Sequence, residues 1–340
     1  MTPGFGGDGL DEDLVLAIDG GNSKTDVVLV TASGRTLSHV RGPGSSPHHL
    51  GIDGAVDLLE DMVMKAAAQA GAGGRQPMAA VAQVNLAGVD FPSEEVAATD
   101  AIARRGWASD LEVGNDSFAL LRAGTDAVDA VAVVCGAGIN CVGVSRDGRH
   151  ARFASLGRIS GDWGGGMELG DEALWWAARA VDGRGPETAL SRLVPEHFGL
   201  LDAPSVYESI HFGRLEHRRL IELAPVVLRA SRDGDEVARG IVTTLGQEVV
   251  HMARAALTRL AMLDVPTVVV LGGGVLTSRD AVLRGEIDAR LAEVAPLART
   301  VVTEVSPVVG AALLGLDRLG ASPEAKQTLR AGLPLTGPAT

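Results

Sequence analysis

The sequence predicts an α/β fold of two domains, and three observations lead to this prediction. Short runs rich in β-branched residues alternate with longer segments of helical periodicity, a pattern typical of sheets covered by helices. The 340 residues exceed the usual span of one hydrophobic core, and an apolar content of 46% suffices for two. Two glycine-rich turns, each held between apolar runs, lie in different halves of the chain.

We expect four segments along the chain. They are a tail over 1–13, an N-terminal domain over 14–125, a C-terminal domain over 126–320 whose last helix packs back on the N-terminal domain, and a second tail over 321–340. The predicted strands are Leu14–Ile18, Val27–Val30, Ala79–Leu86, Leu111–Val113, Val131–Cys135, Cys141–Val144, Thr267–Leu271 and Val301–Val305.

Helical periodicity identifies the covering elements. The first expected helix starts at Asp53 as its N-cap and ends at Gly71, because aspartate accepts from free amides at a helix start and glycine adopts the left-handed cap. Three prolines interrupt the helical region from Leu190 to Arg232. The other expected helices are Phe118–Ala123, Asp171–Val181, Glu236–Leu263 and a last one from Ser306-Pro307 to Leu316.

Charge and composition exclude several classes of protein. A formal net charge of −13 argues against a protein that mainly grips nucleic acid or an anionic membrane. The acidic, glycine-rich start lacks the features of a secretory signal, and no run is long and apolar enough for a membrane helix. With only Cys135 and Cys141, we exclude a disulfide framework, expect a cytoplasmic protein and interpret both cysteines as small buried side chains.

The first glycine-rich turn suits a phosphate. Glycines at its apex allow successive amides to point at phosphate oxygens, and the polar residues after them add donors. Asp19, at the end of the preceding strand, is suited to hold Mg²⁺ through water. An ordinary β-hairpin remains the alternative for this turn alone. The candidate phosphate-binding residues are Gly20, Gly21, Asn22, Ser23, Lys24 and Thr25.

Two further glycine motifs support a nucleotide site. Gly136, Ala137 and Gly138 form the second strand-turn-strand, and each turn is followed by a Gly-Arg pair, as duplication of one half-domain would leave. Gly272, Gly273 and Gly274 end a strand before a helix, where bare backbone can accommodate adenosine. A plain strand-to-helix turn explains the triple glycine equally well.

A carboxylate follows another predicted strand. Asn115 and Asp116 stand between the strand at 111–113 and the next helix. There a carboxylate can serve as the general base for a sugar hydroxyl when the γ-phosphoryl group leaves ATP. The alternative is a helix N-cap.

In their order and spacing, these motifs resemble the N-acetylglucosamine kinase and BadF/BadG/BcrA/BcrD ATPase family of the actin-like sugar kinase superfamily. The motifs are AIDGGNSKTDVVL, VGNDSFALL, CGAGINCVGV and LGGGV, and the resemblance spans roughly 14–320. It implies two actin-like (ribonuclease H-like) domains with a cleft between them, ATP and Mg²⁺ as cofactors, an amino sugar as substrate and a homodimer.

The resemblance also implies roles for residues. Asp116 corresponds to the catalytic base, and His48 can contact the sugar, although a solvated loop residue is the alternative. Trp163, in a Trp-Gly segment before Gly-Asp-Glu, would lie beside the sugar ring or its acyl group. The full set of implied sugar-site residues is Asn115, Asp116, Gly138, Asn140, Asp162, Trp163, Asp171 and His48.

Three departures from the family pattern bear on the sugar. Pro47 occupies the place of an asparagine common in N-acetylglucosamine-binding members, Ala87 replaces a hydroxyl residue, and two extra residues separate Trp163 from Asp171. The acceptor is therefore N-acetylglucosamine, glucosamine or another amino sugar, with the 6-hydroxyl favoured by the resemblance.

Two other functions stay open. One is an ATPase that activates a dehydratase, in which a dimer shares an iron–sulfur cluster held by cysteines. The absence of a CxxC spacing speaks against it. The other is a non-catalytic sugar-responsive regulator. Such proteins usually add a helix-turn-helix, and the segment before Leu14 is too short for one.

Overall fold

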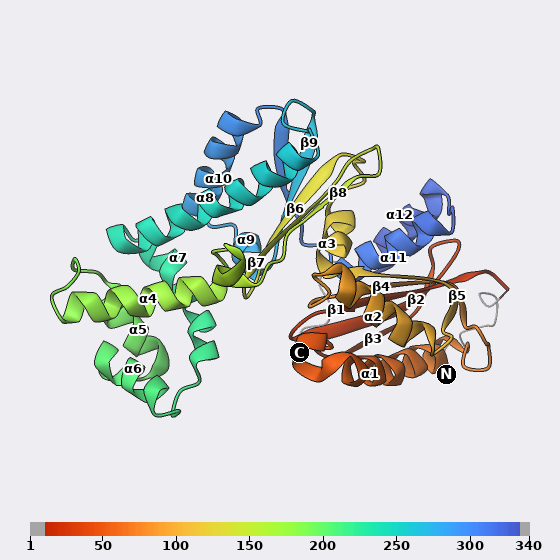
Figure 1. The fold of residues 1–340 in the computed structure, drawn as a ribbon, viewed down its shortest axis with the longest axis horizontal. Coiled ribbons are helices and arrows are strands. Elements are labelled where there is room, and N and C mark those ends of the chain that lie inside the picture. The colour runs from red at the N-terminus through yellow and green to blue at the C-terminus, as the bar shows by residue number, and fades with distance from the viewer. Residues whose placement is uncertain (1–10, 334–340) are drawn as a thin grey trace, which may run out of the picture. The chain divides into compact units, whose positions relative to one another are not determined.

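The computed structural model describes residues 11–333 and divides into two compact units (Figure 1). Of the described residues, unit 1 comprises 11–126 and 303–333, and unit 2 comprises 127–302. Each unit contains one mixed sheet of five strands, which confirms the predicted α/β class. Both expected tails lie partly outside the described residues. Within residues 11–333, no helix has the length and apolar character needed to cross a membrane.

The sheet of unit 1 has the strand order β3-β2-β1-β4-β5. Strand β2 runs antiparallel to β1, whereas β4 is parallel to β1 and β5 is parallel to β4. The strands are β1 (Leu14–Gly20), β2 (Lys24–Thr31), β3 (Thr36–Pro43), β4 (Ala79–Leu86) and β5 (Ala108–Asn115).

Helices cover both faces of this sheet (Figure 1). Leu16 and Ile18 of β1 pack toward α1 (Pro47–Ala70) and α2 (Pro92–Ala103). Val15 and Ala17 point to the opposite face, toward α11. Successive side chains of a strand alternate between faces, so a strand buried on both faces reads as a continuous apolar run. The helices of that second face are α3 (Asp116–Gly124), α11 (Pro307–Arg318) and α12 (Pro323–Gly332).

Unit 2 repeats the strand order of unit 1. Its sheet, followed from the other edge, is β8-β7-β6-β9-β10, with the same parallel and antiparallel pairings. The turn after the second strand also repeats, because Thr31 N donates to Arg35 O at 2.9 Å and Ser145 N donates to Arg149 O at 3.0 Å. The strands are β6 (Ala130–Cys135), β7 (Ile139–Val144), β8 (His150–Arg152), β9 (Thr267–Gly272) and β10 (Ala298–Val302).

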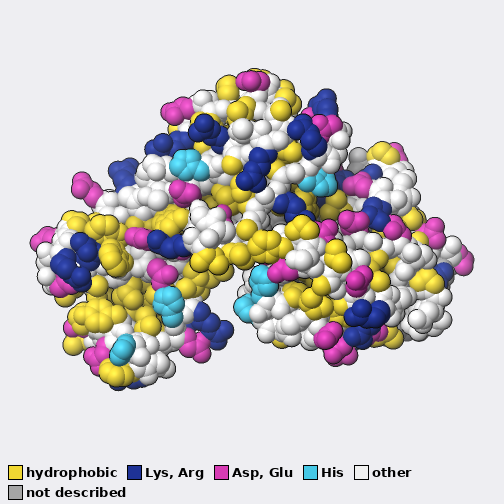
Figure 2. Space-filling model, viewed as in Figure 1, with side chains coloured by type: hydrophobic (Ala, Val, Ile, Leu, Met, Phe, Trp, Pro, Cys, Tyr) yellow, Lys and Arg dark blue, Asp and Glu magenta, His cyan; other side chains and the backbone are white. Residues whose placement is uncertain are grey.

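The helices of unit 2 enclose one large apolar core. They are the 3₁₀ segments η1 (Gly157–Ser160) and η2 (His217–Leu223), and the α-helices α4 (Gly166–Val181), α5 (Leu190–Phe198), α6 (Ala203–His211), α7 (Ala224–Arg232), α8 (Glu236–Arg259), α9 (Gly274–Thr277) and α10 (Ala281–Val294). Apolar side chains are also exposed around α4–α6 (Figure 2). They include Trp175, Leu201, Tyr207 and Phe212.

Several helix boundaries differ from the sequence prediction, and α4 begins at Gly166, before the predicted start at Asp171. Helix α1 begins at Pro47, after Ser46, and Gly51 interrupts it with a non-helical φ of 70°, so Asp53 is not its N-cap. Proline is tolerated in the first helical turn because the amides of that turn have no partner within the helix, so the N–H that proline lacks costs no hydrogen bond. Helix α8 ends at Arg259, before the predicted end. The left-handed cap at Gly71 is as predicted.

Two strands, β3 and β8, were not predicted, and neither were helices α2, α10 and α12. Strand β3 is an edge strand of mixed polar and apolar residues, and β8 has only three residues, so neither has a clear alternating pattern. Strand β10 occupies Ala298–Val302, and thus begins earlier than the predicted run. Helix α12 occupies part of the segment predicted as a tail.

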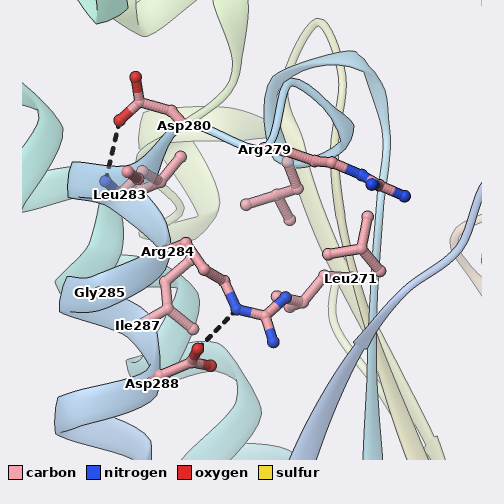
Figure 3. Close-up of a pocket in the computed structure, with 11 residues that line it drawn as sticks. Leu271, Arg279, Asp280, Leu283, Arg284, Gly285, Ile287 and Asp288 are labelled. Atoms are coloured by element: carbon pink, nitrogen blue, oxygen red, sulfur yellow. Dashed lines mark hydrogen bonds and ion pairs between the residues drawn. The ribbon is translucent and has the colours of Figure 1, made fainter. Parts of the chain in front are cut away.

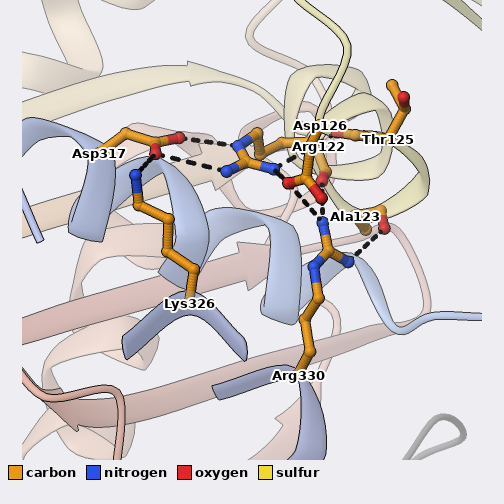
Figure 4. A network of polar contacts seen from close by, with 7 residues as sticks. All are labelled: Arg122, Ala123, Thr125, Asp126, Asp317, Lys326 and Arg330. Atoms are coloured by element: carbon orange, nitrogen blue, oxygen red, sulfur yellow. Dashed lines mark hydrogen bonds and ion pairs between the residues drawn. The ribbon is translucent and has the colours of Figure 1, made fainter. Parts of the chain in front are cut away.

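Ion pairs hold α12 to the end of α3 (Figure 4). Arg122 Nε donates to Asp317 at 2.7 Å, and Lys326 approaches the same carboxyl group at 2.7 Å. Arg330 donates to Ala123 O at 2.9 Å and to Asp126 at 3.0 Å. These contacts add to the burial of Leu329, which belongs to the apolar core under α11.

A buried ion pair joins β2 and β3. Asp26 is fully buried, and Arg41 donates to both of its carboxylate oxygens at 2.9 Å. His39 Nε2 lies 2.7 Å from the same carboxyl group. Burial alone would raise the pKa of Asp26, but the hydrogen bonds from His39 and Arg41 outweigh it, and the pKa is lowered.

We expect Arg41→Met to lower the free energy of unfolding by about 3 kcal/mol at neutral pH, because Asp26 would stay buried without its main partner. The pKa of Asp26 is depressed in the folded state, so its stabilisation is present above the unfolded pKa and is lost as the pH falls through the folded pKa. Chemical denaturation at several pH values should therefore show that the wild type and Arg41→Met differ less in their free energy of unfolding at acidic pH. Arg104→Met, on the exposed end of α2, serves as the control. Equal stability of both variants would contradict the expectation.

Candidate active site

Polar residues of unit 1 gather where three neighbouring strands end. In the parallel register, Asp19 of β1 lies opposite Asn85 of β4, and Leu86 lies opposite Asn115 of β5. Ala87 N donates to Gly20 O at 2.7 Å and continues the pairing past the strand ends. Ligands of α/β sheets bind at the carboxyl ends of parallel strands. This edge therefore carries the candidate catalytic residues of unit 1.

Asp116 is the first residue of α3. Asn115 is the N-cap of this helix, and its side-chain oxygen accepts from Ser117 N at 3.0 Å. The sequence analysis gave a helix N-cap as the alternative role for this pair of residues, and in the structure Asn115 is that N-cap. Burial raises the pKa of Asp116 to about 6, and the negative charge of Asp90 adds to the effect. A carboxyl group with this pKa can accept a proton near neutral pH.

Asp19 is a second buried carboxyl group at the same edge. Its pKa is raised well above the ordinary value, first by burial and then by the charges of Asp116 and Asp26. Within residues 11–333, its carboxylate makes no hydrogen bond or ion pair. A buried carboxylate near other carboxylates is stabilised by a cation, and Mg²⁺ prefers oxygen ligands. The residues present therefore fit a magnesium ion.

The first glycine-rich turn is tight and partly exposed. Gly21 N donates to Lys24 O at 2.8 Å, and Ser45 N donates to Gly21 O at 3.1 Å. A Cβ at Gly20 would lie 2.4 Å from Ser45 Oγ, so only glycine fits there. Thr25 is buried, and its hydroxyl donates to Ser45 Oγ at 2.8 Å. The side chains open to a ligand are those of Asn22, Ser23 and Lys24.

The second glycine-rich turn, in unit 2, exposes bare backbone. A Cβ at Gly136 or Gly138 would meet no atom within 4 Å. The turn is fixed from behind, because Gly166 N donates to Gly136 O at 2.7 Å and Met167 N donates to Ala137 O at 3.0 Å. Open backbone on a fixed turn is what a phosphate group requires for close approach.

The triple glycine ends β9 beside a pocket (Figure 3). A Cβ at Gly273 would lie 2.4 Å from Cys135 O, whereas one at Gly274 would meet nothing within 4 Å. The pocket holds about 660 Å³, a volume typical of small-molecule sites. None of the three glycines lines it; its lining combines apolar side chains with two arginines and two aspartates: Leu271, Leu276, Arg279, Asp280, Ala281, Leu283, Arg284, Gly285, Ile287, Asp288 and Val302. Arg284 Nε donates to Asp288 at 2.6 Å (Figure 3).

The candidate sugar residues of unit 2 surround the second turn and the start of α4. Asn140 accepts from Cys141 N at 2.7 Å and from Ser155 Oγ at 2.5 Å. Asp162 is buried beside Ser160, which donates to it. Trp163 is partly buried against the core of unit 2. Asp171 lies further along α4 and pairs with His217 of η2 at 2.7 Å, a partner that the sequence did not suggest.

His48 lies in unit 1 at the start of α1. Its Nε2 lies 3.2 Å from Glu94 Oε1 of α2, and possible ligand atoms of His48, Asp90 and Glu94 are within 4.8 Å of one another. A Cβ at Gly88 would lie 3.1 Å from the His48 ring. The two loops before α1 and α2 are therefore in contact.

The family model of the BadF/BadG/BcrA/BcrD ATPases matches residues 16–315. The chain belongs to this family. Both half-domain motifs, the Asn115-Asp116 pair and the triple glycine lie inside the matched range.

Relatives of this family member include two proteins that are named as sugar kinases. An N-acetylmuramic acid/N-acetylglucosamine kinase of Clostridium acetobutylicum is 26% identical over 78% of this chain and 86% of its own length. An N-acetyl-D-glucosamine kinase of Dictyostelium discoideum is 23% identical over 91% of this chain and 99% of its own length.

The fold is also that of a solved structure. A candidate N-acetylglucosamine kinase of Chromobacterium violaceum superimposes with a TM-score of 0.70 at 24% identity, over 89% of this chain and 99% of that one. This likeness supports the actin-like architecture of the BadF/BadG/BcrA/BcrD ATPase family for both units.

The cysteines of this family member are buried side chains, as predicted. Cys135 and Cys141 are both free and buried. Burial raises the pKa of the Cys135 thiol to about 12 and that of Cys141 further still. Protonated, buried thiols are poor ligands for an iron–sulfur cluster shared between subunits.

Asp90 is a residue of the site that the sequence analysis missed. It lies in the loop after β4, and Asn115 Nδ2 donates to it at 2.8 Å. The signal was available, because Asp90 follows a predicted strand just as Asp116 does. The sequence could not identify Ser45, Arg41 and His217 as hydrogen-bond partners, because each contact joins segments that are distant in the chain.

Proposed function

We propose that the protein is an ATP-dependent kinase that phosphorylates a hydroxyl of an amino sugar, N-acetylglucosamine or glucosamine, at O6. Membership of an ATPase family and the activities by which two relatives are named support a sugar kinase. The observation that carries the proposal is Asp116, a half-buried carboxyl group with a pKa of about 6 at the carboxyl edge of the sheet.

In this proposal, Asp116 orients the acceptor hydroxyl and accepts its proton. Its raised pKa makes it a stronger base than an ordinary aspartate, yet it is still largely ionised at neutral pH. Asn115 fixes the start of α3 and thereby the position of the Asp116 backbone. The family resemblance assigns sugar-binding roles to His48, Gly138, Asn140, Asp162, Trp163 and Asp171.

The family resemblance assigns the nucleotide to the three glycine motifs. The amides of Gly21 and Gly136 already donate to Lys24 O and Gly138 O, so the groups that would approach the phosphates are the exposed side chains of the first turn and the open backbone at Gly138. The pocket at the end of β9 would bind adenosine. Bound Mg²⁺·ATP would supply the phosphoryl group, and its cation would neutralise part of the negative charge on the phosphates. Asp19 would hold the cation, since its own buried charge lacks a protein partner within residues 11–333.

A coupled assay of ADP release tests the proposal. The panel contains glucosamine, N-acetylglucosamine, N-acetylmannosamine, N-acetylmuramic acid and glucose, each with and without Mg²⁺, and a reaction without sugar measures background hydrolysis. We expect ADP release with one of the amino sugars that exceeds the background at least about 100-fold, because water is a poor substitute for a positioned hydroxyl. Phosphorus-coupled NMR of the product identifies the hydroxyl.

Two outcomes would contradict the proposal. ADP release that is equal with and without every sugar would indicate an ATPase of another kind. Sugar binding without ADP release would favour the alternative function of a non-catalytic, sugar-responsive regulator. The expected homodimer rests on the family resemblance, and sedimentation of the purified protein tests it. The expected cytoplasmic location rests on the low cysteine content.

A further inference from the structure

Asp90 contacts the residue that sets the position of Asp116. Asn115 is buried, and its Nδ2 donates to Asp90 Oδ1 at 2.8 Å. The Oδ1 of the same amide accepts from Ser117 N at 3.0 Å, inside the first turn of α3. The amide of Asn115 therefore lies between Asp90 and the helix that begins with Asp116.

We propose that Asp90 is a positioning residue for Asp116, acting through the side-chain amide of Asn115; this rests on the proposed function, in which Asp116 is the base. An Asn side chain can rotate its amide, and a cap holds only while its oxygen faces the helix. The nitrogen of the amide donates to Asp90 Oδ1 at 2.8 Å and, at the longer distance of 3.4 Å, to Val89 O, so Asp90 is the closer of the two acceptors that fix which end points at Ser117 N. Asp90 thus selects the orientation that caps α3.

The backbone of Asp90 is held in place by Glu94, a residue of the following helix turn. Glu94 Oε2 accepts from the backbone amides of Asp90 at 2.8 Å and Phe91 at 3.0 Å. Glu94 also pairs with His48 at the start of α1. The backbone of Asp90 is thus held independently of its side chain. Loss of the Asp90 carboxylate should therefore change the Asn115 contact without releasing the loop.

A second contact fixes Asn115 from the side of the sheet. Asn85 Nδ2 of β4 donates to Asn115 O at 3.0 Å, and Gln83 Nε2 donates to Asn85 Oδ1 at 3.2 Å. The backbone of Asn115 is therefore anchored by β4, and the remaining freedom is rotation of its side chain. The proximity of Asp90 to Asp116 is also reflected in the raised pKa of Asp116, to which burial contributes most and Asp90 next.

The test compares kcat and the KM for ATP in Asp90→Ala and Asp90→Asn. We expect Asp90→Ala to lower kcat by about 10- to 100-fold, the loss typical of a misplaced catalytic group, with the KM for ATP unchanged. Asp90→Asn keeps an oxygen acceptor and should restore most of kcat. Asp100→Asn, at an exposed position of α2, is the matched control and should leave both parameters unchanged.

Exchanging the side chains of Asp90 and Asn115 tests whether kcat depends on the hydrogen bond between them or only on correct folding. Asn115→Asp can still cap α3, but it cannot donate to Asp90, so kcat should fall as in Asp90→Ala. The double variant Asp90→Asn/Asn115→Asp restores one donor and one acceptor in reversed order, and kcat should recover at least about tenfold over the Asn115→Asp variant. Circular dichroism of each variant checks the fold.

The outcomes distinguish this inference from the proposed function. If Asp116→Asn is inactive but Asp90→Ala keeps full kcat, or if the exchange gives no recovery, Asp90 is not a positioning residue and the kinase proposal stands. If Asp116→Asn keeps full activity, the assignment of the base fails and the inference fails with it.

Discussion

Replacing Asp116 by asparagine is expected to lower kcat by about 10²- to 10⁴-fold and to leave the affinity for ATP unchanged. Asparagine has the shape of aspartate and can occupy the first position of α3, so the fold should persist. It cannot accept the proton of the sugar hydroxyl, because an amide is not a base near neutral pH. Steady-state kinetics with the preferred sugar, together with calorimetric titration of ATP, measure the two quantities.

The same residue predicts a pH dependence. The base is active when ionised, and the pKa of Asp116 is about 6, so kcat/KM should fall below about this pH and level off above it. Burial is the main cause of the raised pKa, and the charge of Asp90 is the second. Asp100→Asn should keep the wild-type profile. A profile that stays flat down to the pKa of an ordinary aspartate would exclude Asp116 as the base.

The fold could be predicted from the sequence because its strands are apolar runs ended by glycines. Ala79–Leu86 was predicted with the bounds that the structure has, since helices bury both faces of β4. Edge strand β3 was missed because half-exposed positions dilute its pattern. Helix α12 was missed because few apolar side chains, Leu329 among them, join its core contacts, and the pairing of Arg330 with Asp126 depends on a distant segment.

The candidate site could be predicted only in part. Motifs close in sequence, such as Asn115-Asp116 and the glycine turns, indicated the chemistry that each residue type supports. Roles that arise from long-range contacts could not be read from one sequence. Thr25 illustrates this limit, because its hydroxyl is bound by Ser45 across the sheet edge and is not exposed with its neighbours.

The second large effect is expected at Gly310, where α11 crosses α3. A Cβ on this glycine would lie 1.8 Å from Ala119 O and 2.7 Å from Ala123 N, both backbone atoms of α3. No rotamer can relieve a clash with backbone, so the helices must separate. We expect Gly310→Ala to lower the free energy of unfolding by at least about 4 kcal/mol, beyond the usual cost of overpacking. Thermal unfolding followed by circular dichroism measures it.

This variant should also impair catalysis, because α3 begins with Asp116 and cannot move away from α11 without carrying that carboxyl group along. Gly240→Ala is the matched control. Gly240 lies on an exposed turn of α8, and a Cβ there would meet no atom within 4 Å, so alanine should stabilise the helix by up to about 1 kcal/mol. If both variants unfold at the same temperature, the close contact of α11 with α3 does not limit stability. If Gly310→Ala is destabilised but keeps full kcat at low temperature, the position of Asp116 does not depend on that contact.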